Sequence, residues 1–158
     1  MKNAFEENYV FYRLVSTDLD EAYRSLHDIR RYKRGPIVMA LIKNAVISYA
    51  RPFMQCKGKY RNDYRLCEKR VVPPKYRKLH KKILNYRNQV FAHIDIGVRE
   101  PGLGKLNLGT AMLYPIRLKG KGFYYEDYLT LVDEMKELIL TVKDAVLIEI
   151  NEYQKKLR

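Results

Sequence analysis

An arginine, an amide and a histidine lie close together in the segment from Tyr86 to Asp95. The segment reads YRNQVFAHID, and five residues separate Arg87 from His93. RNA can be cut by its own 2′-hydroxyl when a base accepts that proton and an acid protonates the leaving oxygen. Histidine suits proton transfer because its pKa lies near neutrality, and arginine suits a phosphate because its planar fork stays charged. We therefore assign His93 to proton transfer and Arg87 to the scissile phosphate. Asn88 would orient the histidine, the backbone or the substrate.

Positive charge is concentrated in the stretch that leads into this segment. Residues 51–90 hold 13 Lys and Arg against two acids, Asp63 and Glu68, which is +11 of the chain's net +13. A concentrated basic stretch attracts polyanions, so the charge favours a nucleic acid partner. A solvated basic face, or an acidic membrane or protein partner, is the alternative. Three tyrosines are interleaved with these basic residues, namely Tyr60, Tyr64 and Tyr76. They either stack on bases or pack against protein.

The pair Arg87-Asn88 followed by His93 resembles the signature of the HEPN superfamily, and the stretch Ser48–Phe53 resembles a segment found ahead of it. The resemblance implies a metal-independent endoribonuclease without a cofactor, acting on RNA as a homodimer in a toxin–antitoxin or phage-defence system. It also implies an antitoxin or a nucleotidyltransferase as partner. In some members a nucleotidyltransferase modifies a tyrosine that lies two residues after the histidine. In this chain that position is Asp95. The alternatives are a non-catalytic module that binds RNA, a nucleotide or a protein, and a purely structural bundle.

Three further residues complete the expected substrate-binding set. Arg51 adds a cation, His80 precedes Arg87 by seven residues and so shares its helix face, and Asp95 ends the segment. Each has a structural alternative, because His80 and Asp95 can pack or cap. Likewise Arg87 can pair with an acid of the last helix, and the candidates are Glu134 and Glu137.

The angle between the two main site residues is unfavourable within one chain. Six residues at about 100° each put Arg87 and His93 about 120° apart on a regular helix. A long arginine or a distorted helix can bridge that angle, and so can a two-fold axis that brings both copies into one cleft. The segment is therefore interpreted as half of a site shared by a homodimer.

The elements that must position these residues are mainly helices. Apolar residues spaced by three or four predict helices over 4–31, where Ser16 and Thr17 allow a break near the middle, and over 37–49. A third helix opens at Pro73-Pro74 and stops near Gly97, and the last starts at Tyr124 or Asp127. The sequence of residues 98–123 predicts a small hairpin or an irregular arm. The chain is expected to be one all-α domain over 1–158, an up-and-down bundle of about four main helices.

Several other classes of protein are not indicated. Cys56 and Cys67 form no CxxC pair and lack zinc spacing with histidine, so no metal site is expected. The longest apolar run, Ile37 to Ile42, is far too short to span a membrane. No apolar signal core opens the chain. We expect a cytoplasmic protein without a membrane partner.

Overall fold

The computed structural model describes residues 3–32, 35–88, 101–103, 106–107, 109, 112–113, 116–118 and 128–157. Helix α1 (Ala4–Asp28) begins where the Asn3 side chain accepts a hydrogen bond from the Glu6 amide at 2.8 Å. It continues as the 3-10 turn η1 (Ile29–Arg31). No break occurs in its middle, because Ser16 is buried and the Thr17 hydroxyl donates to the Arg13 carbonyl at 3.2 Å.

The middle of the chain alternates helices with short turns. Helix α2 (Pro36–Ala50) starts on its proline, whose fixed φ suits a first helical position. The 3-10 turn η2 (Arg51–Phe53) and the single-turn helix α3 (Glu68–Val71) flank an irregular segment. The 3-10 turn η3 (Pro74–Tyr76) then leads into helix α4 (Arg77–Tyr86). The predicted stop of this helix at Gly97 lies outside the described residues.

A short helical stretch at Tyr128 and Leu129 precedes the last helix. Helix α7 runs from Val132 to Leu157, after a turn in which the Leu131 amide donates to the Tyr128 carbonyl at 2.9 Å. Tyr124 and Asp127 lie outside the described residues. The predicted apolar stripe is nevertheless buried along its whole length; it consists of Tyr128, Val132, Met135, Ile139, Val142 and Val146.

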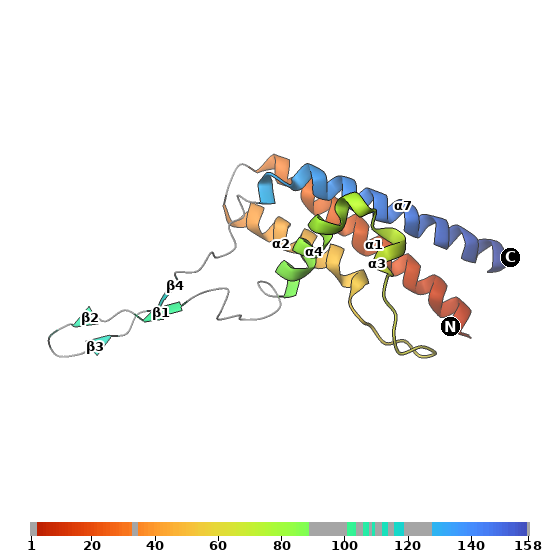
Figure 1. The fold of residues 1–158 in the computed structure, drawn as a ribbon, viewed down its shortest axis with the longest axis horizontal. Helices are drawn as coiled ribbons and strands as arrows, with labels where there is room; N and C mark the ends of the chain where they lie inside the picture. Colours follow the sequence, from red (N-terminus) through yellow and green to blue (C-terminus); the bar gives the residue numbers. More distant parts are fainter. Residues whose placement is uncertain are drawn as a thin grey trace.

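The helices pack as an all-α bundle, which confirms the predicted fold class. Helices α1 and α7 lie side by side along their length, and the start of α1 and the end of α7 lie at the same end of the bundle (Figure 1). Helix α2 packs along α1, and α4 packs on α2. Fully buried side chains from these helices form one core; they include Leu19, Ile42, Ile83 and Ile139. None of the helices described contains a stretch long and apolar enough to cross a membrane.

Paired strands occupy the predicted insertion. Strand β1 (Pro101–Leu103) pairs antiparallel with β4 (Ile116–Leu118), and β2 (Leu106–Asn107) pairs antiparallel with β3 (Met112–Leu113). The nesting of the inner pair within the outer pair is the order that one hairpin produces (Figure 1). The hairpin expected between the third and last helices is therefore confirmed.

Candidate nucleic-acid interface

A hollow of about 670 Å³ lies beside α4, between this helix and the start of α7. Leu79 and Leu131 contribute apolar lining, and Glu134 contributes one acid. The other charged residues of the lining are four lysines, here called the α4 lysine groove: Lys75, Lys78, Lys81 and Lys82. The groove arises from helical periodicity, because α4 buries Leu79 and Ile83 in the core and turns its lysines outward.

The lysines of the α4 lysine groove outnumber the one acid of its lining. Within the described part of the chain, none of the four lysines forms an ion pair. Lys75 and Lys82 instead place their ammonium groups 4.5 Å and 5.5 Å from the ring centroids of Tyr76 and Tyr128. Some other cations of the basic stretch are paired, as Arg70 is with Glu149 and Arg65 with Asp63. The four groove lysines thus carry part of the excess charge of the sequence.

Arg87 and Asn88 directly follow the groove. They continue the chain beyond α4 in a wider π-type turn, a distortion that is frequent at functional sites. Nη1 of Arg87 donates to Oδ1 of Asn88 at 2.9 Å. No ion pair joins Arg87 to the α7 acids considered as alternative partners: Glu137 instead accepts a hydrogen bond from the Tyr76 hydroxyl at 2.8 Å, and Glu134 lines the groove.

Arg51 is held by acids of α1. It forms ion pairs with Asp18 and, at 3.8 Å, with Glu21. Burial raises the pKa of the Asp18 carboxyl, and the Arg51 guanidinium partly offsets this effect. The contact of Arg51 with substrate stays a prediction, because the contacts described for this side chain tie it to α1.

His80 lies in the interior and does not line the groove. Its side chain is 1% exposed, and its Nδ1 lies 2.8 Å from the Tyr49 hydroxyl. Its Nε2 lies 3.6 Å from Oε2 of Glu68, and its ring centroid lies 4.5 Å from that of Phe53. Burial lowers the pKa of His80, although Glu68 opposes that effect. The imidazole is therefore neutral at pH 7, and the structure gives it a packing role.

His93 and Asp95 lie outside the described residues. The structure therefore describes the first half of the predicted site, and it brings Arg87 and Asn88 together at the end of the groove. The groove lysines were not predicted individually as site residues. Their signal was available, since Lys75, Lys78 and Lys82 recur at helical spacing beside Leu79 and Ile83.

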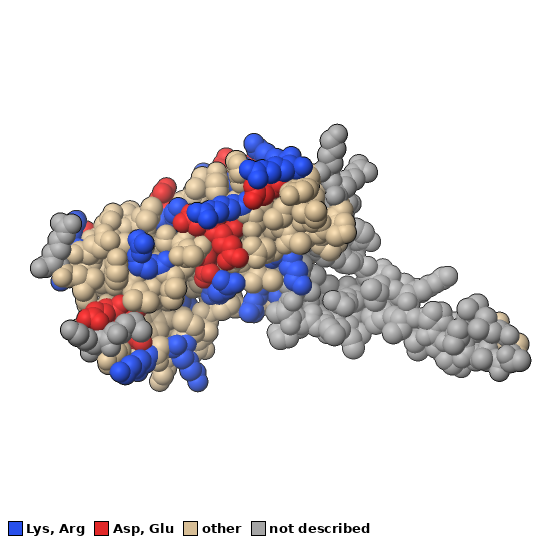
Figure 2. Space-filling model, turned by 180° about the vertical axis from the view of Figure 1, so that it is seen from behind, with Lys and Arg blue, Asp and Glu red and all other residues tan. Residues whose placement is uncertain are grey.

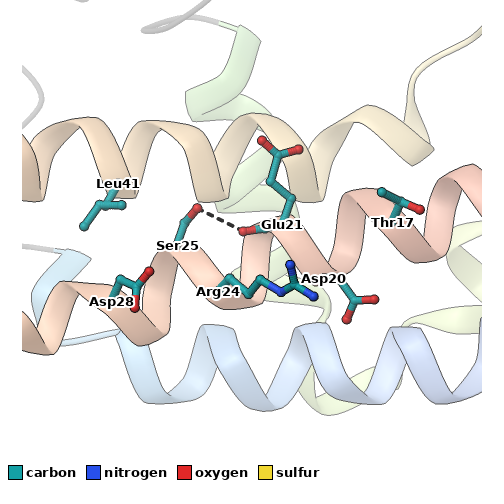
Figure 3. A pocket seen from close by; sticks show the side chains of 7 residues that line it. All are labelled: Thr17, Asp20, Glu21, Arg24, Ser25, Asp28 and Leu41. Carbon is teal, nitrogen blue, oxygen red and sulfur yellow. Dashed lines mark hydrogen bonds between the residues drawn. The ribbon is translucent and has the colours of Figure 1, made fainter.

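A second hollow, of about 450 Å³, opens along α1 and has the opposite character (Figure 3). Its acids already have structural partners. Asp20 pairs with Lys143 of α7 at 2.5 Å, and Glu21 accepts from the Asn44 amide of α2 at 3.2 Å. Ser25 donates to the Glu21 carbonyl at 2.9 Å, which is the dashed line in Figure 3. These groups join the helices, and their negative charge disfavours a phosphate.

Acidic and basic side chains lie close together on one face of the molecule. The face drawn in Figure 2 carries acidic side chains through its middle, with Lys and Arg beside them. Among the described residues, no three His, Cys, Asp or Glu side chains are grouped so that they could hold a metal ion. The α4 lysine groove, with its single acid, is therefore the candidate interface.

Fold and groove together define an all-α bundle with a groove beside one helix that is lined by four lysines and one acid. In comparisons with known proteins, the chain matches no family model, no curated protein and no solved structure. Its function must therefore be argued from the residues themselves.

Proposed function

We propose that the chain is a metal-independent endoribonuclease. RNA binds along the α4 lysine groove and is cut at a site that contains Arg87, Asn88 and His93. The observation that supports the proposal best is the position of four lysines, without ion pairs in the described part, directly ahead of Arg87. A nucleic acid backbone supplies the regular negative charge that such a row of cations binds.

The proposed reaction uses the 2′-hydroxyl of the RNA as nucleophile. His93 accepts the 2′-hydroxyl proton, the 2′-oxygen bonds to phosphorus, and the bond from phosphorus to the 5′-oxygen breaks. An acid, which the partner's copy of the histidine can provide, protonates the leaving 5′-oxygen. The products are a 2′,3′-cyclic phosphate and a 5′-hydroxyl. Arg87 stabilises the phosphorane, where negative charge builds up.

Asn88 has a specific part in this proposal. Its Oδ1 accepts one N–H of Arg87 at 2.9 Å, which fixes the guanidinium while its remaining N–H groups stay available for a phosphate. Asn88 would thus be a positioning residue for Arg87. We propose that a homodimer brings the two copies of the site together in the cytoplasm, with an antitoxin as a further partner in a toxin–antitoxin or phage-defence system.

Cleavage of single-stranded RNA by purified variants tests the proposal. We expect Arg87→Ala and His93→Ala each to lower the cleavage rate by about 10²-fold or more, which is typical of losing a positioned catalytic group. Arg77→Ala is the control, because it removes an exposed cation of α4 outside the groove. All three should keep the helical circular dichroism spectrum, and EDTA should have no effect.

The same experiment can contradict the proposal in two ways. Cleavage that persists in both Arg87→Ala and His93→Ala would overturn the site. Salt-sensitive RNA binding by the unmodified chain without any strand scission would instead favour a non-catalytic binding module.

A further inference from the structure

The segment between η2 and α3 contains a tightly built turn, residues 57–61, here called the basic turn. Cys56 and Tyr64 form a two-residue antiparallel bridge, with backbone hydrogen bonds of 3.0 Å and 2.9 Å. At its tip the Gly58 amide donates to the Arg61 carbonyl at 2.8 Å. These backbone hydrogen bonds close the segment into a compact turn.

A buried carboxylate of α1 anchors the basic turn to the bundle. Glu7 is 5% exposed and accepts hydrogen bonds from the Lys59 amide at 2.5 Å, the Tyr60 amide at 2.9 Å and the Tyr64 hydroxyl at 2.7 Å. Burial acts to raise the pKa of Glu7, but these hydrogen bonds outweigh it and the pKa is lowered. A Cβ added at Gly58 would lie 2.6 Å from Cδ of Glu7, so only glycine fits this approach.

The anchored turn displays cations and one aromatic ring. Lys57, Lys59 and Arg61 are exposed, and residues 57–61 include no acid. Tyr60 is 42% exposed, whereas Tyr64 is buried at 3% and packs against Phe11. The Lys59 ammonium lies 5.2 Å from the centroid of the Tyr60 ring. A base stacked on Tyr60 would therefore have a cation within reach of its phosphate.

We infer that the basic turn is a second RNA-contacting element, in which an unpaired base stacks on Tyr60 while Lys57, Lys59 and Arg61 contact the flanking phosphates. Stacking on an aromatic side chain needs an unpaired base and tolerates any sequence. The element therefore selects single-stranded RNA over duplex. This inference rests on the proposed RNA substrate and narrows it. Because Glu7 already holds the turn in place, the turn would lose less conformational entropy when it binds RNA.

Binding of two non-cleavable RNAs by the full chain tests the inference. The probes are a fluorescein-labelled 2′-O-methyl oligouridylate of about 12 nucleotides and a 2′-O-methyl duplex of the same length. Their blocked 2′-oxygens separate binding from cleavage. We expect Tyr60→Leu to weaken single-strand binding about tenfold, the usual effect of losing one stacked base, and to leave duplex binding unchanged. Tyr60→Phe keeps the ring and should bind as the unmodified chain does.

A variant of the α4 lysine groove separates this inference from the proposed function. Lys78→Gln with Lys82→Gln should weaken both probes. If it does so while Tyr60→Leu has no effect, the inference is overturned and the proposed groove stands. If only Tyr60→Leu weakens the single strand, the inference stands and the groove is overturned. Equal weakening of both probes by Tyr60→Leu would overturn stacking, and absence of RNA binding at low salt would overturn both.

Discussion

His80 lies between a phenol and a carboxylate, and its surroundings define its protonation. Burial raises the pKa of Tyr49 far above its usual value, so the phenol keeps its proton and donates it to Nδ1 of His80. The proton of the neutral imidazole is then on Nε2, which faces Glu68. Protonation of Nδ1 would reverse the direction of the hydrogen bond to Tyr49 and place a charge in the core.

Stability should therefore fall as pH drops below the ordinary pKa of histidine. The folded-state pKa of His80 is lowered, so between that value and about 6.5 the unfolded chain binds more protons than the folded one. We expect the free energy of unfolding to decrease below about pH 6.5, by at most about 1.4 kcal/mol per pH unit from this group. Urea unfolding between neutral and mildly acidic pH measures it.

The matched variants for this pH dependence are His80→Gln and His27→Gln. His80→Gln should flatten the pH profile, while His27→Gln changes an exposed histidine on α1 and should leave the profile as it was. An unchanged profile in His80→Gln would show that other groups cause the pH dependence.

At the scale of elements, helix α7 offers two leucines with opposite surroundings. Leu138 is fully buried, and Leu140 is 42% exposed. Leu138→Ala should lower the free energy of unfolding by about 2–5 kcal/mol, because it removes buried methyl groups and leaves a cavity. Leu140→Ala should change it by about 0.5 kcal/mol or less. Denaturant unfolding of the two variants measures the difference, and equal losses would contradict the packing of α7.

Helices were predictable from the sequence where apolar spacing is regular. The apolar stripe from Tyr128 to Val146 is buried as its spacing indicated. Helix ends were less predictable, since the turn at Leu131 separates the helical residues 128–129 from α7 without any proline or glycine to mark it. The basic turn could not be foreseen, because its anchor, Glu7, is 52 residues away from Lys59.

The site was predictable only where its chemistry is local. Arg87 and Asn88 are adjacent in sequence, and their hydrogen bond follows from that adjacency. The burial of His80 could not be predicted from the sequence. Its spacing from Arg87 shows that the two residues share a helix face, but it does not show which residues cover that face. Its cover comes from Tyr49 and Phe53, on α2 and η2.

For the whole molecule, the display of charge at α4 predicts how RNA binding responds to salt. Each phosphate contact with single-stranded nucleic acid contributes about −0.7 to the slope of log K against log salt concentration. Lys78→Gln with Lys82→Gln should therefore reduce the magnitude of the slope by about 1.4. The control is Lys155→Gln with Lys156→Gln, which removes equal charge from the end of α7. Equal slopes for the two double variants would contradict a localised groove.

The proposed homodimer predicts complementation between two inactive chains. If Arg87 of one protomer acts with His93 of its partner, a mixed dimer of Arg87→Ala and His93→Ala chains keeps one such pair, although it lacks the second histidine proposed as the acid. We expect partial cleavage activity after the two variants are mixed, unfolded and refolded together, and none when either is refolded alone. A mixture that stays inactive, with exchange of protomers verified, would place both residues of a site in one chain.

The amides of Lys59 and Tyr60 belong to a surface turn, yet their acceptor is a buried carboxylate on another element. Amide hydrogens exchange with solvent only when such bonds open. These two amides should therefore exchange slowly for a loop, at a rate governed by opening between Glu7 and the turn. Hydrogen exchange at Lys59 and Tyr60 would thus report how often the basic turn separates from the first turns of α1.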